Sequence, residues 1–461
     1  MKWKLALISE HASPLALVGG VDAGGQNIAV AELAQALAKI GYQIDIFTRW
    51  DDKNLPQVVE WQPNVRIVHL EAGPVHYVPK EELLPFMKDF TANFIRFSEK
   101  EGNPYRLVHA HFFMSALVAA DIKKELGIPF VVTFHALGKV RRMIQGECDR
   151  FPAERFAIEE RVIREADQLV ALCPQDREDL MTLYEADPAK ITIVPNGVNT
   201  SEFYVVDKLL ARLLLGLDPN EIIILQLGRM VPRKGVDNVV RAVGTLRRDH
   251  GVWARLLIVG GESDVPDPAI TPEIGRLQAL AREEGVEEWV TFAGRRQRDT
   301  LRYFYSAADV FVTTPWYEPF GITPLEAMAC GVPVIGSEVG GIKHTIMDGQ
   351  TGFLVPPNNP ETLANRMLTL IQYPRIQNAL RRNALRRVHK HFTWQSVAQL
   401  TASLYETVGL PRPQVLRVEK VEPVLGSQPL MSNRVKKCSF RSLVEKGQER
   451  RDIRQETGGW R

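Results

Sequence analysis

The chain has 461 residues, and its 57 lysines and arginines nearly balance 55 aspartates and glutamates. This balance argues against a protein that coats nucleic acid, and the length exceeds what one hydrophobic core usually serves, so we expect two domains and room for a tail. No stretch approaches about 18 uninterrupted apolar residues, and the N-terminal run LALI is too short for a signal peptide. Four scattered cysteines (Cys148, Cys173, Cys330 and Cys438) without zinc spacing favour a reducing, cytoplasmic location.

Short β-branched runs alternate with helical patterns along most of the chain. The first half contains KLALIS, QIDIFT, RIVHL, LVHAHF, FVVTFH, QLVALC and ITIVP, and the alternation restarts with EIIILQLG, RLLIVGG, WVTFAG, DVFVTT, PVIGS and GFLVP. Strands that alternate with helices predict parallel sheets covered on both faces. We therefore predict an α/β fold of two doubly wound, Rossmann-like domains, with ligands in the cleft at the carboxyl ends of the strands.

Turn-forming residues cluster over residues 196–207 and mark a linker. We predict a first domain over residues 1–200, a second domain over 201–390, and a tail over 411–461. From Arg434 onward the tail carries nine basic and four acidic residues. A solvated appendage is the favoured interpretation of this tail, and contact with a membrane or partner surface is the alternative.

Two glutamates flank a stretch that cannot be one helix in PWYEPFGITPLEAMACG, residues 315–331. The two prolines inside it predict that Glu318 lies on a loop and that a helix begins at Thr323. Glu326 would then be the third helical residue, where it could form a capping box with Thr323.

That interpretation leaves the amides of Phe320, Gly321 and Ile322 unexplained at the start of the helix. Helix N-termini favour phosphates and other anions. An anion held there between two carboxylates indicates a ligand that carries both phosphate and hydroxyl groups. In LGRMVPRKGV, Arg229 follows a strand and Lys234 precedes a helix, so both can face the cleft and bind this phosphate.

The segment GGVDAGGQN joins the first strand to a helix, but it is not the dinucleotide-binding pattern G-x-G-x-x-G. The second strand also ends without the acidic residue that would hold a ribose, so a nicotinamide cofactor is disfavoured. Gly24 and Gly25 would instead let the backbone approach a ligand from the opposite domain.

Three histidines lie at or near strand ends. HAHF places His109 and His111 on one face of a strand, and His135 follows another. No carboxylate or cysteine stands near them in sequence, so we expect no metal site. Beyond His135, the basic group of Lys139, Arg141 and Arg142 suits a second anionic ligand.

With these motifs, the chain resembles the retaining GT-B glycosyltransferases of the group that includes sucrose-phosphate synthase and D-inositol-3-phosphate glycosyltransferase. The resemblance runs from the first strand to roughly residue 405. It rests on DAGGQ, HAHF, TFHALGKVRR, LGRMVPRKGV and above all YEPFGITPLEAMACGVPVIGSEVGG, which contains the E-x7-E pattern.

The resemblance implies a nucleotide-sugar donor, a UDP-sugar, bound by the second domain. In the family, residues at the positions of Arg229 and Lys234 bind the donor pyrophosphate, and one at Glu318 binds the sugar hydroxyls. Glu326 would bind the ribose and Arg296 would lie near the base. Further donor contacts are assigned to Gly25, Phe320, Gly321 and Ile322. His135 would lie beside the transferred sugar and act in catalysis with Glu318, Arg229 and Lys234. The implied reaction is retaining transfer without a metal or other cofactor, and a last helix over 391–410 crosses back to the first domain.

For the acceptor, Lys80 and Arg155 match residues that hold a phosphate in the inositol-phosphate enzymes. Gln26, His111, Lys139 and Arg141 complete the acceptor side. The tyrosine and threonine of those enzymes are replaced by Phe112 and Ala136, which lack the hydroxyls. Fructose 6-phosphate, inositol phosphate and lipid-linked or polysaccharide acceptors therefore all stay open.

Three other functions are consistent with parts of this pattern. A nucleotide-sugar epimerase shares the fold, a nicotinamide dehydrogenase shares the domain type, and a non-catalytic sensor would bind the donor without turnover. The sequence sets neither the donor sugar nor the oligomeric state.

Overall fold

The structure of the protein is a computed structural model that describes residues 4–16 and 24–413, all within one compact unit of the chain. The predicted tail over 411–461 lies outside the described residues except for its first three positions. So does most of the glycine-rich segment before Gly24.

The first sheet has eight strands in the order β3-β4-β2-β1-β5-β6-β7-β8. Their bounds are β1 Lys4–Ile8, β2 Gln43–Arg49, β3 Val58–Gln62, β4 Val65–Leu70, β5 Tyr105–His111, β6 Phe130–Thr133, β7 Gln168–Ala171 and β8 Ile191–Ile193. All neighbours pair in parallel except β3, which runs antiparallel to β4 at the edge. The seven predicted strands are confirmed. β3 was missed because an exposed edge strand need not carry a continuous apolar run.

The side chains of each strand alternate between the two faces of the sheet, and helices cover both faces. They are α1 Gly25–Lys39, α2 Met87–Lys100, α3 Phe113–Leu126, α4 Gly138–Gln145, α5 Glu154–Glu165 and α6 Pro174–Tyr184. On β1, Ala6 and Ile8 pack in the core with α2 and α3, whereas Leu5 and Leu7 pack with α1.

The second sheet has six parallel strands in the order β11-β10-β9-β12-β13-β14. Its strands are β9 Ile223–Leu227, β10 Arg255–Val259, β11 Val290–Gly294, β12 Val310–Thr313, β13 Val334–Ser337 and β14 Phe353–Val355. Its helices are α7 Lys208–Leu215, α8 Val236–His250, α9 Pro272–Glu283, α10 Leu301–Ala307, α11 Ile322–Ala329, α12 Ile342–Thr345, α13 Pro360–Gln372 and α14 Pro374–His391. The predicted fold class, two parallel α/β domains, is confirmed.

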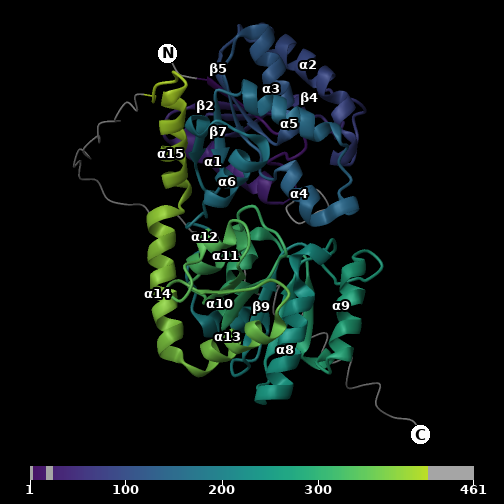
Figure 1. Cartoon of the computed structure of the whole chain (residues 1–461), viewed down its shortest axis with the longest axis vertical. Coiled ribbons are helices and arrows are strands. Elements are labelled where there is room, and N and C mark those ends of the chain that lie inside the picture. Colours follow the sequence, from purple (N-terminus) through teal and green to yellow (C-terminus); the bar gives the residue numbers. More distant parts are fainter. Residues whose placement is uncertain (1–3, 17–23, 414–461) are drawn as a thin grey trace, which may run out of the picture. The chain divides into compact units, whose positions relative to one another are not determined.

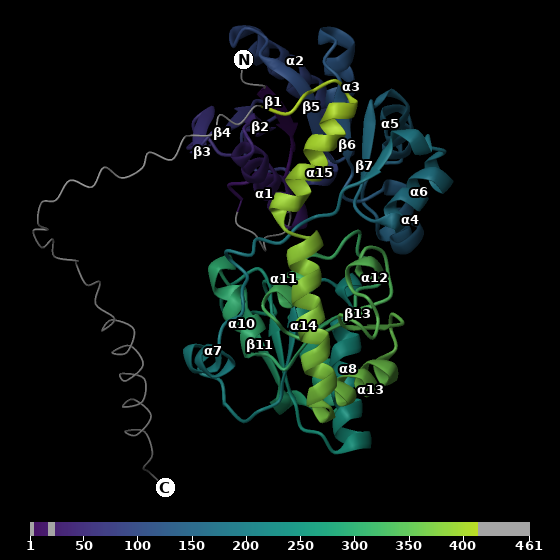
Figure 2. The same ribbon diagram turned by 90° about the vertical axis from the view of Figure 1, so that its left-hand side faces the viewer.

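The last described helix, α15 Trp394–Thr407, packs in the core of the first domain, although it follows the second domain in the chain (Figures 1 and 2). Trp394, Val397 and Tyr405 lie in the same buried cluster as α1. The two passages of the chain between the domains lie side by side, since the amide of Val198 donates to the carbonyl of Phe392 at 2.7 Å.

Candidate active site

One cavity is lined by residues of both domains at the carboxyl ends of their strands. The first domain contributes the start of α1 and the segment after β6, and the second contributes the segments after β9, β10, β11 and β12. This is where an open parallel sheet binds ligands. Predicted residues that line it are Gly25, Gln26, Lys80, His135, Arg141, Arg229, Lys234, Arg296, Glu318, Phe320, Gly321, Ile322 and Glu326.

The helix after β12 begins earlier than the sequence predicts. α11 starts at Ile322, and its N-cap is Gly321, which has a φ of +90° and so occupies a backbone region that favours glycine. Thr323 therefore lies inside the helix, and the capping box with Glu326, the alternative to a ligand-binding role, does not form. The side chain of Glu326 bonds to other side chains, and it lies at the fifth helical position instead of the third.

Glu318 and Lys234 face each other across the second-domain side of the cavity and form an ion pair. Burial works against the charge of Glu318, but Lys234, Arg233 and Arg229 outweigh it and lower the pKa of the carboxyl. Burial also lowers the pKa of the Lys234 ammonium, an effect that Glu318 opposes. Three cations thus lie near one carboxylate, an arrangement that suits an anionic ligand.

Glu326 is buried with both carboxylate oxygens already bonded. Arg298 Nη1 donates to Oε1 and the hydroxyl of Tyr305 donates to Oε2, each at 2.9 Å. Burial raises the pKa of the Glu326 carboxyl, and Arg298 acts in the opposite direction. The oxygens keep lone pairs that can accept from hydroxyl groups in the cavity.

The glycine loop of the first domain approaches the second domain closely. A Cβ added to Gly24 would lie 3.9 Å from Arg229 Nε, and one added to Gly25 would lie 3.6 Å from Ile322 Cδ1. The backbone of this loop therefore faces both the cation group and the start of α11, the two places predicted to bind phosphate.

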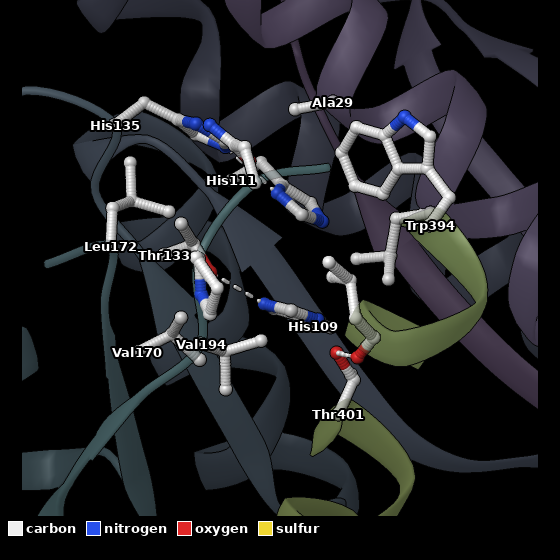
Figure 3. Close-up of a pocket in the computed structure, with 14 residues that line it drawn as sticks. Ala29, His109, His111, Thr133, His135, Val170, Leu172, Val194, Trp394 and Thr401 are labelled. Atoms are coloured by element: carbon white, nitrogen blue, oxygen red, sulfur yellow. Dashed lines mark hydrogen bonds between the residues drawn. The ribbon is translucent and has the colours of Figure 1, made fainter. Parts of the chain in front are cut away.

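His135 lies at the edge of this cavity with a φ of +59°, and its Nε2 is 2.9 Å from Nδ1 of His111. Figure 3 shows both rings beside His109 in a small pocket that α15 closes with Trp394 and Thr401. Burial lowers the pKa of His135 to about 3, so the ring is neutral at ordinary pH. A neutral imidazole offers one donor and one acceptor.

The structure separates the predicted acceptor residues into two groups. Lys80 and Arg141 line the cavity, although each also pairs with an acid, Lys80 with Glu81 at 3.1 Å and Arg141 with Asp149 at 2.8 Å. Gln26 lines it too, and its amide donates to the His111 carbonyl at 3.2 Å. His111 lies behind His135 in the small pocket. Lys139 points away, with its ammonium 2.8 Å from Glu160 and 2.7 Å from the Leu183 carbonyl.

Arg155 is also outside the cavity lining. Its side chain is 1% exposed, its Nε lies 2.8 Å from Glu159, and its guanidinium stacks on Phe112. Arg155 thus supports the floor of the first-domain side and is already occupied as a charge partner. Phe112, which it supports, has a φ of +89°, a conformation that a bulky residue adopts only under strain.

Several cavity residues were not predicted from the sequence. Arg298 contacts Glu326, Arg233 adds to the cations around Glu318, and His11 lines the first-domain side. His11 had a usable signal, because it follows the first strand at the sheet edge where ligands bind. Arg298 had none, since it is one arginine of three in FAGRRQRD.

Among the described residues, no group of three or more His, Cys, Asp or Glu is arranged to hold a metal ion. Within the same residues, no helix is long and apolar enough to cross a membrane. Cys148, Cys173 and Cys330 are free thiols.

Two Rossmann-like domains that both line one cavity at the carboxyl ends of their strands form the GT-B fold. The family model described as Glycosyltransferase Family 4 matches residues 23–202, and that of Glycosyl transferases group 1 matches residues 212–387. The chain belongs to this glycosyltransferase family. It therefore transfers a sugar from a nucleotide sugar to an acceptor.

Similar proteins cover nearly the whole described chain. The D-inositol 3-phosphate glycosyltransferase of Actinosynnema mirum is 36% identical over 87% of this chain and 96% of its own length. The solved sucrose-phosphate synthase of Thermosynechococcus elongatus is 35% identical, with a TM-score of 0.80 over 88% of this chain and 99% of its own. Anabaena HepE, solved with UDP-glucose, shares the fold at 19% identity and a TM-score of 0.68, over 88% of this chain and 99% of its own.

Proposed function

We propose that the protein is a retaining hexosyltransferase that uses a UDP-sugar, needs no metal ion, and transfers to a sugar phosphate or other glycan acceptor. The observation that carries this proposal is the juxtaposition of Arg229, Lys234 and Glu318 with the start of α11 in one cavity. The cations and the helix amides suit a diphosphate, and the carboxylate suits sugar hydroxyls.

The same cations support the metal-independent form of the reaction. As the bond from the sugar to the diphosphate breaks, negative charge grows on the leaving oxygen. Arg229 and Lys234, with the amides at the start of α11, would stabilise that charge. The leaving phosphate takes the proton of the acceptor hydroxyl as the new glycosidic bond forms on the same face, which retains the configuration. Lys234 would exchange Glu318 for phosphate when the donor binds.

Lys80 and Arg141 support a phosphorylated acceptor. Both line the first-domain side of the cavity, across from the proposed donor site. Phe112 and Ala136 line the same side and offer no hydroxyl groups, so acceptor recognition would depend more on charge than on neutral hydrogen bonds. The relative from Actinosynnema mirum is named for D-inositol 3-phosphate, and the solved structure from Thermosynechococcus elongatus is named for sucrose-phosphate synthesis.

A panel assay of nucleotide release tests the proposal. Several UDP- and ADP-sugars are each offered with fructose 6-phosphate, inositol 3-phosphate, and unphosphorylated fructose and inositol, with and without EDTA. We expect turnover with a UDP-hexose and a phosphorylated acceptor, undiminished by EDTA, and a product with the anomeric configuration of the donor. Epimer formation without acceptor, or binding without turnover, would contradict the proposal.

A further inference from the structure

Arg298 has an unusual number of acidic neighbours for one side chain. It begins the short 3-10 helix Arg298–Thr300 before α10 and lines the active-site cavity. Its Nη1 donates to Glu326 at 2.9 Å, its Nε donates to Glu202 at 2.9 Å, and its Nη2 lies 3.9 Å from Glu32. Each side of the guanidinium therefore faces a carboxylate.

These carboxylates come from three separate parts of the chain. Glu326 belongs to α11 of the second domain, Glu202 to the segment that joins the domains, and Glu32 to α1 of the first domain. Asn199 donates to both oxygens of Glu32, at 3.2 and 3.3 Å. The guanidinium also stacks on the ring of Phe203 at 4.8 Å. A long side chain with so many partners is restricted to one rotamer.

The contact to Glu326 has a direct chemical consequence. Glu326 is 2% exposed, and a carboxylate so deeply buried tends to take up a proton unless a cation faces it. Arg298 is the cation that faces it. An ionised carboxylate only accepts hydrogen bonds, as two hydroxyls of one ribose require, whereas a protonated one must also donate.

We propose that Arg298 is a positioning residue that pairs with Glu326, opposes its uptake of a proton, and orients it to accept the ribose hydroxyls of the donor. Its contacts to Glu202 and Glu32 fix it from the linker and the first domain. This inference rests on the proposed function, in which Glu326 binds the ribose.

Nucleotide binding by the full chain tests the inference without any acceptor. Calorimetry measures the affinity for UDP and for 2′,3′-dideoxyuridine diphosphate, which lacks the ribose hydroxyls. We expect wild-type protein to bind UDP at least about tenfold more tightly, since hydrogen bonds to a charged group are the stronger kind. In Arg298→Gln, UDP binding weakens by about the same factor while the dideoxy compound binds as before, so the ratio approaches one.

Arg302→Ala is the matched control, because Arg302 lies one turn away and stacks on Tyr204 and Tyr303 outside the cavity lining. It should leave both affinities unchanged. Circular dichroism confirms that each variant is folded.

The possible results separate the inference from the proposed function. If Arg298→Gln weakens the binding of UDP and of the dideoxy compound equally, the ratio of the two affinities stays at its wild-type value. Arg298 then has only a structural role, and the inference is wrong. The same holds if wild-type protein does not distinguish the two nucleotides. If wild-type protein binds no UDP, the proposed donor itself is wrong.

Discussion

Lys234 and Glu318 are paired with each other, although each is expected to bind a different part of the donor. The pair keeps two half-buried charged side chains oriented toward each other. When the donor binds, Lys234 would bond to the diphosphate and Glu318 to the sugar, so that one set of charge-assisted hydrogen bonds replaces another. The pairing orients both side chains, and side chains that are already oriented lower the entropic cost of binding a ligand.

Lys234→Ala should remove most of the transfer activity. The variant loses a cation that would stabilise the leaving diphosphate, and a loss of about 100- to 1000-fold in kcat is typical for one electrostatic group. Steady-state kinetics with the donor and acceptor found in the panel assay measures it. Arg247→Ala on the surface of α8 is the control, and wild-type turnover in Lys234→Ala would remove this residue from the site.

Glu326→Gln should raise the KM for the donor by about tenfold or more, since a neutral amide replaces a charged acceptor of ribose hydroxyls. A glutamine could serve in a capping box nearly as well as a glutamate. The structure shows that Glu326 has no capping role, so a wild-type KM in this variant would contradict its assignment to the ribose.

Sequence reasoning located Glu318, Lys234 and Arg229 because each follows a strand, and parallel strands end at one edge. The sequence did not show that Lys234 and Glu318 form an ion pair, or that Arg229 acts on the same carboxylate. The mistake at Thr323 has a similar origin: local helix rules favour threonine as the cap, but Gly321 can adopt the positive φ that the tight loop requires. The contacts of Arg298 join residues nearly 300 positions apart, and no local pattern encodes such a distance.

Strands β5 and β6 bring three neutral histidines together behind the cavity. Burial lowers the pKa of His109 and His135 to about 3, and that of His111 well below its ordinary value. His109 is held between the hydroxyls of Tyr405 and Thr133, both at 2.8 Å. Polar contacts of His109 thus join the strand ends to α15.

These histidines should make the protein less stable in mild acid. In the unfolded chain each titrates near pH 6.5, so below that pH the unfolded state takes up protons that the folded state excludes. Between pH 7 and 4.5 each histidine should cost about 2–3 kcal/mol of unfolding free energy. Urea titrations at both values measure the loss, which should shrink in His109→Gln but not in the exposed His250→Gln.

Helix α7 exposes its leucines and buries an arginine, the reverse of most surface helices. Leu209, Leu210, Leu213 and Leu214 face solvent, whereas Arg212 is buried, with its Nη2 2.8 Å from Asp309. The sequence KLLARLLL would suggest leucines on the core side. The charged contact decides the orientation, because Arg212 also donates to the carbonyls of Ala307 and Pro219.

In α7, replacing an exposed leucine should therefore change the stability little, whereas replacing the buried arginine should lower it. Hydropathy alone would predict the reverse. Leu213→Ser, at a residue 77% exposed, should change the unfolding free energy by less than about 0.5 kcal/mol. Arg212→Ala should cost about 2–3 kcal/mol, because Asp309 keeps only Lys208 as a charged partner and the carbonyls of Ala307 and Pro219 lose a donor. Chemical denaturation measures both, and a larger loss from Leu213→Ser would mean that this face is covered.

At the scale of the whole molecule, α14 and α15 connect the end of the second domain to the core of the first. α14 packs its Leu380, Ala384 and Val388 against the second domain, and α15 begins after a break at Thr393, whose hydroxyl accepts from the amide of Ser396. The alternation of strands and helices predicted the two domains. The place of α15 came from the family resemblance, because its sequence does not show which core it joins.

Two leucines of α15 should separate its buried face from its exposed face. Leu404 is 2% exposed and lies in the first-domain core, whereas Leu400 is 44% exposed. Leu404→Ala should cost about 2–5 kcal/mol, and Leu400→Ala less than about 0.5. Thermal unfolding followed by circular dichroism measures both, and equal effects would contradict the packing of α15.

The return of α15 also sets an order of events during synthesis. The last strand of the first sheet ends at Ile193, but the helix that completes its core begins at Trp394. A ribosome needs about 10–40 s to add the roughly 200 residues between them. During that interval the nascent first domain has its strands but lacks one covering helix. Chaperone binding to ribosome-held chains should therefore persist until the final helix has emerged from the exit tunnel.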